Sequence, residues 1–405
     1  MNFSPNILKQ IAATEGTPTF IYSELVLKAN LERILKAAAN HNLEKRVRLF
    51  IAYFCNSNPH LFKIITKQTA GILLQTKEEY AQIKKSNLKA ENIVSPAVLS
   101  NEEIDFWVKE SVPVNLSSLE EVEYFITTYP STPLHFRLDL TSKGKQRTGI
   151  KIYQLEKFAN ILKVSRITPR SFHVYVGTSS SCQKVLQNSA RAFRIFKKYF
   201  PDASSINLGG GFGFNYATSI ESRKHFPWNE YFRGLNRLLK KYEIPESIKI
   251  ILEPGRDIFA DSGIFLLSVN RIITHKANIK IATNGSYVYV PSSTIRKRQH
   301  KVNFFAKDFI ERKPDNKRGF LSGCTTLSSD YIFPGSISVP KNISKGDFIV
   351  IKDMGAYTAT QHMEFLNKKP CSEILIRENG EAVRITRRGD EADKLRYLLT
   401  NPEKI

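Results

Sequence analysis

Two short motifs hold the residues that are best suited to binding an anion. The first is the run Leu208–Gly213, in which Gly209, Gly210 and Gly211 would let backbone N–H groups approach a phosphate closely. The second is the run Glu253–Arg256, which sets a carboxylate and a guanidinium close together. A glycine run alone is often a plain turn, and a carboxylate near an arginine is often a structural ion pair. Together at one edge of a fold, the two motifs favour a site for a phosphorylated ligand.

The elements around these motifs indicate how the chain would bring them together. Between Arg48 and Arg256, β-rich runs alternate with longer amphipathic segments, a pattern typical of repeated βα units. Eight such units favour a closed barrel, in which reactive groups lie at the carboxyl ends of the strands. The glycine run follows the seventh expected strand, and Glu253 ends the eighth. The expected strands are 49–54, 71–76, 92–95, 112–116, 134–140, 172–176, 206–208 and 248–253.

The order of motifs along nearly the whole chain resembles that of diaminopimelate and ornithine decarboxylases, which are pyridoxal-phosphate enzymes of fold type III. Gly16–Tyr22 is similar to the start of the diaminopimelate group, and Ser171–Thr178 to the sixth strand of the family. Gly323–Asp330 looks like the catalytic loop, and Asp353–Thr358 like the segment whose tyrosine reaches the phosphate. The resemblance implies an α/β fold, an alanine-racemase-like (β/α)8 TIM barrel with a C-terminal β domain.

The pattern of expected secondary structure changes after Arg256, where strand-like runs are joined by turns that contain Gly, Pro and Asn. We therefore expect a barrel over 26–260 and a separate β domain over 261–405. The resemblance implies that the N-terminal segment, 1–25, joins the β domain. The strands expected there are 17–22, 263–274, 279–290, 348–352, 373–377 and 382–386.

The resemblance also implies a site for pyridoxal phosphate. By position, the three glycines would hold the cofactor phosphate together with Tyr357, and Arg256 would add charge nearby. Glu253 would face the pyridine nitrogen and keep it protonated, which makes the ring an electron sink. The full set of expected cofactor-binding residues is Gly209, Gly210, Gly211, Glu253, Gly255, Arg256, Tyr357 and Thr178.

The cofactor lysine of the family is missing from this sequence. Ile51–Pro59 aligns without a gap with the family's run Tyr-Ala-Val-Lys-Ala-Asn-Ser-Asn-Pro, and Phe54 takes the place of the lysine. A phenyl ring offers no amine for covalent attachment and cannot carry a proton. The resemblance therefore implies that the family's usual route to decarboxylation is closed.

Four further positions depart from the family's pattern. Tyr175 stands where a histidine would stack on the cofactor ring, and Leu73 replaces an aspartate near the rim of the site. Thr326 and Leu327 occupy the positions of the loop cysteine and its acidic neighbour. Together with Phe54, these changes predict a degenerate member that has no intact catalytic set, and no metal site is expected.

The composition of the chain bears on its partners, its location and the state of its cysteines. The chain has 405 residues and a formal charge of +22, but its densest basic runs, Lys143–Arg147 and Arg296–Lys301, lack interleaved aromatic residues, which argues against nucleic acid. No run approaches the roughly 18 to 20 apolar residues of a membrane span, and the N-terminus lacks a signal pattern, so we expect a soluble cytoplasmic protein without membrane contact. The widely spaced cysteines, Cys55, Cys182, Cys324 and Cys371, predict reduced core thiols.

Three functions stay open from the sequence. The first is a degenerate subunit or regulator, in a homodimer or in a heterodimer with an active paralogue. The second is a remodelled enzyme that holds pyridoxal phosphate noncovalently, or another phosphorylated ligand. The third is an active amino-acid decarboxylase in which Lys63 or Lys67 serves, although both follow the first strand on its helix and would have to reach back over the rim.

Overall fold

The computed structural model describes residues 3–68, 71–141, 148–275 and 278–390, so the basic run Lys143–Arg147 lies outside the described residues. The chain forms two compact units. One unit, called here the barrel unit, comprises Lys28–Phe214 and His225–Ile258. The other, called the β unit, comprises Met1–Leu27, Asn215–Lys224 and Phe259–Ile405.

The barrel unit contains a parallel sheet whose strands run in the order β4-β3-β2-β10-β9-β8-β6-β5. A parallel bridge between Val94 and Val114 joins its two ends, and β7 (Ile150–Lys151) adds to β6. The prediction of eight barrel strands is confirmed. Their bounds are β2 Val47–Ala52, β3 Gly71–Leu74, β4 Glu91–Val94, β5 Asn115–Leu116, β6 His135–Asp139, β8 Ser171–Val174, β9 Ser205–Asn207 and β10 Lys249–Leu252.

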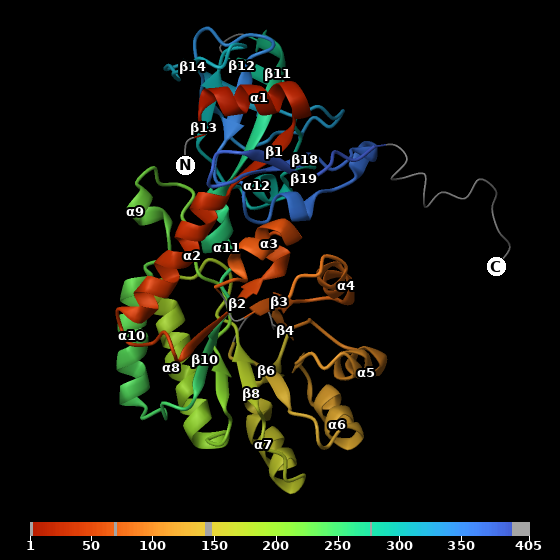
Figure 1. The fold of residues 1–405 in the computed structure, drawn as a ribbon, viewed down its shortest axis with the longest axis vertical. Coiled ribbons are helices and arrows are strands. Elements are labelled where there is room, and N and C mark those ends of the chain that lie inside the picture. Colours follow the sequence, from red (N-terminus) through yellow and green to blue (C-terminus); the bar gives the residue numbers. More distant parts are fainter. Residues whose placement is uncertain (1–2, 69–70, 142–147, 276–277, 391–405) are drawn as a thin grey trace, which may run out of the picture. The chain divides into compact units, whose positions relative to one another are not determined.

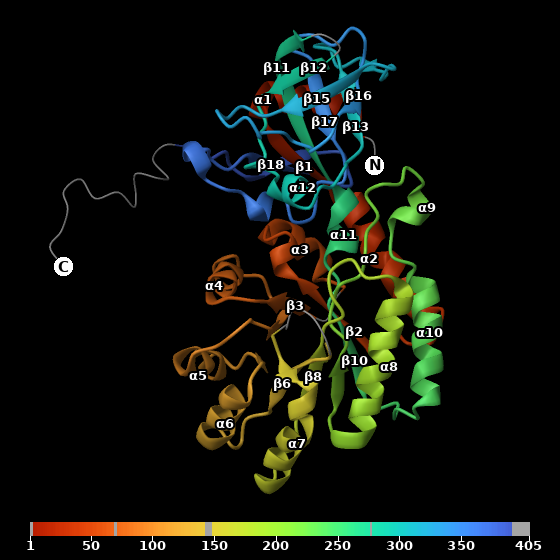
Figure 2. The same ribbon diagram turned by 180° about the vertical axis from the view of Figure 1, so that it is seen from behind.

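Helices surround these strands, and each presents an apolar face to them (Figures 1 and 2). In α10 the buried side chains Trp228, Tyr231, Phe232, Leu235 and Leu239 recur with helical spacing. Hydroxyl side chains begin several helices; in α5, for example, Ser100 and Glu103 form a capping box. The helices are α2 Glu24–Ala39, α3 Pro59–Ile65, α4 Lys77–Lys85, α5 Asn101–Lys109, α6 Leu119–Thr128, α7 Leu155–Val164, α8 Cys182–Tyr199 and α10 Trp228–Lys241.

The β unit is built on a second sheet, in the order β14-β13-β17-β11-β1-β18-β19, with β12, β15 and β16 attached beside β11. The N-terminal strand β1 lies inside this sheet, antiparallel to β11 and parallel to β18. The strands are β1 Thr19–Ser23, β11 Gly263–His275, β12 Asn278–Thr283, β13 Val302–Phe305, β14 Glu311–Arg312, β15 Arg318–Ser322, β16 Ile337–Ser338, β17 Phe348–Ile351, β18 Ser372–Ile376 and β19 Ala382–Thr386.

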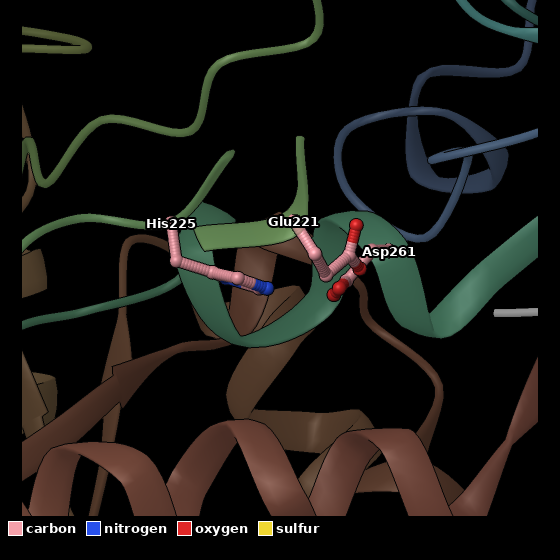
Figure 3. A group of neighbouring side chains, drawn as sticks. All are labelled: Glu221, His225 and Asp261. Carbon is pink, nitrogen blue, oxygen red and sulfur yellow. The ribbon is translucent and has the colours of Figure 1, made fainter. Parts of the chain in front are cut away.

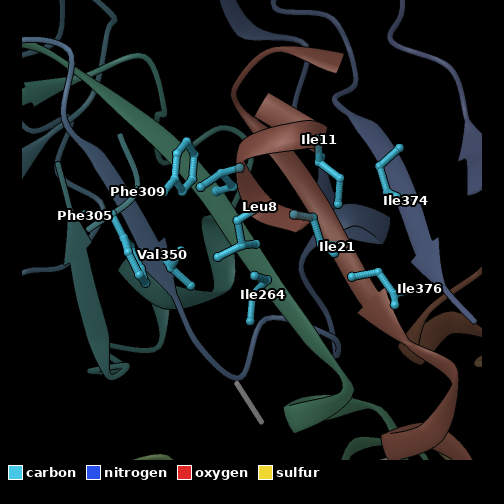
Figure 4. Close-up of a cluster of buried hydrophobic side chains, with 10 residues drawn as sticks. Leu8, Ile11, Ile21, Ile264, Phe305, Phe309, Val350, Ile374 and Ile376 are labelled. Carbon is cyan, nitrogen blue, oxygen red and sulfur yellow. The ribbon is translucent and has the colours of Figure 1, made fainter. Parts of the chain in front are cut away.

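A cluster of buried apolar side chains fixes helix α1 (Pro5–Glu15) on this sheet (Figure 4). Leu8 and Ile11 of α1 lie among Ile21, Ile264 and Ile374 from three neighbouring strands. The remaining short helices are α9 Glu221–Lys224, α11 Arg256–Phe259 and α12 Pro291–Ile295.

Two expectations for the β unit need correction. The strand expected over 279–290 ends at Thr283, because the chain turns at Gly285 and the following Ser286 and Tyr287 bind the carboxylate of Asp330 instead of a neighbouring strand. Four strands, β13 to β16, were not expected. Among the described residues, no helix is both long and apolar enough to cross a membrane.

Candidate functional site

The glycine run follows β9 at the carboxyl end of the barrel strands. Gly209 and Gly211 have φ values of +69° and +97°, which side chains other than glycine rarely adopt. A Cβ atom at Gly209, Gly210 or Gly211 would lie 2.3, 2.4 or 2.1 Å from a neighbouring carbonyl oxygen. Close packing of the strand ends therefore explains the glycines by itself, without a ligand.

Two N–H groups of the run remain available to an anion. The N–H of Gly209 donates to Oδ1 of Asn207 at 2.9 Å. In the described part of the chain, the hydrogen bonds include none from the N–H of Gly210 or Gly211. These two donors, at the carboxyl edge of a parallel barrel, are the part of the run that suits a phosphate.

Glu253 is a buried carboxylate that directly follows β10. Its Oε1 accepts a hydrogen bond of 2.7 Å from Nδ2 of Asn207, and its Oε2 lies 3.2 Å from Nε2 of His173. Burial acts to raise the pKa of Glu253, but His173, Asn207 and Arg137 outweigh it, so the pKa is lowered from the ordinary value. The site thus holds an ionised carboxylate, as a protonated ring nitrogen would require.

The residues that support Glu253 were not predicted. Arg137, His173 and Asn207 lie opposite one another in register on β6, β8 and β9, so they form one polar row across three strands. Nδ1 of His173 is buried and has no hydrogen-bond partner in the described structure. The sequence signal was present: each is a polar residue between apolar neighbours in a strand, which indicates an inward position near a site.

Phe54 lies in a short 3-10 turn, η1 (Tyr53–Cys55), immediately after β2. The N–H of Ala52 donates to the carbonyl of Pro254 at 3.1 Å, which ties this turn to the end of β10. Gly255 also fits closely here, since a Cβ on it would lie 3.1 Å from the Cβ atoms of Ala52 and Cys55. Phe54 therefore stands at the same end of the barrel as Glu253 and the glycine run.

The other expected barrel residues are also at or near the strand ends. Tyr175 and Thr178 follow β8, and their hydroxyl groups lie 3.0 Å apart, while the guanidinium of Arg137 lies 5.8 Å from the centre of the Tyr175 ring. Arg256 is buried and begins α11. Leu73 is a buried core residue of β3, where a charged side chain would need a partner.

The remaining expected residues belong to the β unit. Tyr357 lies in the turn after β17 with φ of 57°. Thr326 and Leu327 lie in the loop between Gly323 and Asp330, where Leu327 is 40 % exposed. The structure places these three residues in a different unit from the glycines and Glu253.

Asp330 organises that loop and was also not predicted. Its carboxylate accepts hydrogen bonds from the hydroxyl of Ser286, from N–H of Tyr287, and from both N–H and hydroxyl of Thr325, at 2.7 to 3.0 Å. Thr326 and Leu327 thus lie on a loop that Asp330 fixes, and they carry a hydroxyl and an apolar side chain.

The two lysines that the sequence offers as alternative attachment points are exposed on the barrel unit. Lys63 lies on α3 and Lys67 just after it, and both are exposed. The four cysteines are free, and Cys55, Cys182 and Cys371 are buried.

Two carboxylates of the β unit, Glu221 and Asp261, come within 4.8 Å of each other (Figure 3). The ammonium group of Lys224 lies 3.7 Å from Oε2 of Glu221 and supplies a positive charge next to the pair. His225, also drawn in Figure 3, has its Nδ1 2.7 Å from Arg33 and 3.2 Å from Asp257 within the barrel unit. Their neighbours account for these groups without a metal ion.

The barrel residues fit pyridoxal phosphate in part. Gly210 and Gly211 offer free N–H groups for the phosphate, Glu253 offers a charge for the ring nitrogen, and Tyr175 offers an aromatic face. Phe54 offers no amine, so the fit at this position is for a cofactor without a covalent link.

Comparisons with known proteins agree on one family. The family described as "Pyridoxal-dependent decarboxylase, pyridoxal binding domain" matches residues 28–260. The diaminopimelate decarboxylase of Thermoplasma acidophilum is 23 % identical over 95 % of this chain and 94 % of its own length. The L-glutamyl-[BtrI acyl-carrier protein] decarboxylase of Niallia circulans is 22 % identical over 97 % of this chain and 96 % of its own length.

Solved structures show the same fold. Diaminopimelate decarboxylase from M. jannaschii in complex with L-lysine superposes with a TM-score of 0.85 at 18 % identity, over 96 % of this chain and 94 % of the other. Lysine/ornithine decarboxylase from Vibrio vulnificus with putrescine gives 0.78 at 20 % identity, over 93 % and 98 %. The fold is therefore a TIM barrel with a β domain, and the chain belongs to the pyridoxal-dependent decarboxylase family.

Proposed function

We propose that this chain binds pyridoxal phosphate, or a similar phosphorylated ligand, without covalent attachment and has lost the decarboxylation of its family. The observation that carries the proposal is that groups suited to binding the cofactor and a residue without an amine lie at the same end of the barrel. Gly210, Gly211 and Glu253 keep the groups that would bind the cofactor, whereas Phe54 lies there without an amine.

Each group has a defined part in such binding. The N–H groups of Gly210 and Gly211 would donate to the phosphate, and Arg256 would supply positive charge. Asn207 and His173 hold Glu253 in place, so that its carboxylate can accept a hydrogen bond from a ring nitrogen. Pyridoxal phosphate, when bound, supplies a ring that accepts electrons from a substrate.

Loss of the amine points to a supporting role in an assembly. We expect a homodimer, or a heterodimer in which an active paralogue performs the chemistry. A remodelled enzyme with a noncovalent cofactor is the alternative, and an active decarboxylase with a displaced lysine is disfavoured by the exposed positions of Lys63 and Lys67.

The first prediction is that the purified protein binds pyridoxal phosphate at least about tenfold more tightly than pyridoxal. Charge-assisted hydrogen bonds to the phosphate contribute on the order of 1.5 to 3 kcal/mol each, so even one of them would produce this difference. Isothermal titration calorimetry with both ligands measures it directly. Equal affinities, or no binding of either ligand at millimolar concentration, would leave the glycine run as a structural turn only.

The choice of variant matters for this experiment. Gly210→Asp would bring a like charge to the phosphate, but its Cβ would also lie 2.4 Å from the carbonyl of Glu253, so a loss of binding would report a disturbed fold. Thr178→Val, in the barrel unit, is cleaner because it keeps the size of the side chain and removes a single hydroxyl. We expect it to weaken binding of pyridoxal phosphate alone, while Thr168→Val, at an exposed residue, changes neither affinity.

A further inference from the structure

Two neighbouring helices of the barrel unit, α8 and α10, share one outer surface. They lead from β8 to β9 and from β9 to β10, and these three strands pair in parallel, so the two helices run in the same direction side by side (Figures 1 and 2). Gly234 allows their close contact, because a Cβ atom on it would lie 2.5 Å from Cδ1 of Leu186. Side chains that point outward from α8 and α10 therefore belong to a single surface.

This surface has an excess of positive charge. Helix α8 carries five Lys or Arg residues and no Asp or Glu, and α10 carries four Lys or Arg residues and a single Glu. Lys197 and Lys198 form ion pairs with Glu243 and Glu156, at 2.6 and 3.6 Å. The ammonium group of Lys241 lies over the ring of the tyrosine that follows it. Three of the nine cations are thus accounted for by their neighbours.

The other six cations have no such partner. In the described part of the chain, their side chains form no ion pair and no hydrogen bond. Cations in the last turn of a helix complement its dipole, but this effect is confined to that turn, and only Lys240 lies there. These six residues, called here the basic face, are Lys184, Arg191, Arg194, Arg233, Arg237 and Lys240.

The basic face follows the repeat of the helix. Arg233, Arg237 and Lys240 recur at positions i, i+4 and i+7, and Arg191 and Arg194 are three positions apart. Side chains at this spacing are neighbours about 5 to 6 Å apart, and like charges there destabilise a helix. Carboxylates of a partner at the same spacing would remove this repulsion along both helices.

The remaining side chains of the two helices indicate what kind of partner fits. Both helices lie wholly within the described residues, and neither exposes a large apolar or aromatic side chain. A helix that binds a membrane surface has apolar side chains that enter the lipid, and a site for single-stranded nucleic acid has aromatic rings on which bases stack. An acidic helix of another protein needs only carboxylates at helical spacing.

We propose that the basic face binds an acidic helix of a partner protein, in which Glu or Asp residues recur at positions i, i+4 and i+7. The inference is independent of the proposed function, because α8 and α10 contain none of the residues assigned there to the cofactor.

Two labelled peptides of about 20 residues test the spacing. Both are alanine-based and have the same number of Glu residues, which recur at i, i+4 and i+7 in the first peptide and are consecutive in the second. Fluorescence anisotropy at low salt should show that the first peptide binds at least about fivefold more tightly, and added salt should weaken its binding. Equal affinities would mean that only net charge is recognised and would overturn the inference.

A triple variant tests the place of binding. Arg194→Gln, Arg233→Gln and Arg237→Gln together should weaken binding of the first peptide at least about tenfold, which corresponds to about 1.4 kcal/mol. Glutamine is a good helix former, so both helices should persist, and circular dichroism checks this. If the triple variant does not fold, Arg194→Gln with Arg237→Gln replaces it, with an expected loss of about fivefold.

A matched control removes the same charge elsewhere. Lys313→Gln, Lys317→Gln and Lys345→Gln together remove three exposed cations of the β unit and should leave the affinity for the first peptide within about twofold. The reverse replacement, with lysine at the three arginine positions, should stay within about threefold of wild type because the charge remains. Equal losses in the glutamine variant and in the control would overturn the inference.

Two further probes test the class of partner. A DNA duplex and phosphatidylcholine vesicles that contain phosphatidylserine should respond equally to the triple variant and to the control, since they would sense only the net charge. If the triple variant loses more affinity for either probe than for the first peptide while the control keeps it, the basic face recognises phosphate groups, and the assignment to an acidic helix is overturned.

Discussion

Glu253 is held in place by contacts that do not involve Phe54. Asn207 and His173 keep its carboxylate oriented and ionised, and neither depends on an amine at position 54. Under the proposed function, the binding of the cofactor and its covalent attachment would therefore depend on different side chains, and a single substitution can examine each.

The second prediction follows from that separation. Phe54→Lys should restore covalent attachment of pyridoxal phosphate, because η1 places residue 54 at the carboxyl end of β2 next to the end of β10. Decarboxylation should stay low, since the resemblance assigns Thr326 and Leu327 to the positions of the groups that handle the proton and the substrate amine. Mass spectrometry after borohydride reduction measures attachment, and released carbon dioxide measures turnover of diaminopimelate, ornithine or lysine.

Two controls accompany this variant. Wild-type protein should give no pyridoxyl adduct, and His60→Lys, which adds an amine at an exposed position of α3, should give none either. An adduct on a wild-type lysine would revive the displaced-lysine hypothesis. Rapid turnover by Phe54→Lys would show that the loop replacements matter little.

The third prediction concerns His135 of β6. Burial, assisted by the nearby charge of Arg170, lowers the pKa of His135 to about 4. A histidine with a lowered pKa in the folded state is neutral there, whereas the unfolded chain takes up a proton below about pH 6.5, so acid favours unfolding. Between pH 7.5 and pH 5 the free energy of unfolding should fall by about 2 kcal/mol through this group.

Urea unfolding of wild type and His135→Gln at the two pH values isolates this effect. The difference between the two proteins should shrink on acidification, because only the wild type carries the titrating ring at this position. A difference that is independent of pH would show that His135 is protonated alike in both states. His41→Gln, at a position nearer the surface, serves as the control.

Elements of the fold were predictable where hydrophobic pattern and length agreed. The barrel strands can be recognised in the sequence as short apolar runs between amphipathic helices, because both faces of a parallel barrel strand are buried. The strands β14 and β16 have two residues each and carry no such pattern. Their pairing depends on neighbours that are distant in sequence, which a local pattern does not report.

Some residues of the candidate site could likewise be predicted from the sequence, and others could not. Gly209 to Gly211 and Glu253 could be found because strand ends are visible in the sequence. His173 and Asn207 were missed because their register across β8 and β9 exists only once the sheet is built.

The fourth prediction is that Ile21→Ala strongly destabilises the β unit. Ile21 is fully buried on β1, between β11 and β18 and against helix α1. Removing a buried aliphatic side chain of this size costs about 2 to 5 kcal/mol. Urea unfolding should show this loss, whereas Ile310→Ala, at a residue that is 66 % exposed, should stay within about 0.5 kcal/mol. Equal effects would mean that β1 contributes little to the core.

The whole molecule is made of two units that are both discontinuous in sequence. The chain passes from one to the other after Leu27, Phe214, Lys224 and Ile258. Cutting it near residue 260 would therefore leave β1 and the segment 215–224 with the wrong fragment.

The place of β1 in its sheet has a consequence for biosynthesis. Thr19 leaves the ribosome early, but its neighbour Ser372 follows 353 positions later. In the nascent chain, one edge of β1 can pair with β11 once residues 263–266 have emerged, but the other edge has no partner until β18 follows, after every residue of the barrel unit. The sheet of the β unit is thus completed only when its last strands have been synthesised, and until then the growing polypeptide exposes an unpaired edge of an apolar strand, which favours aggregation.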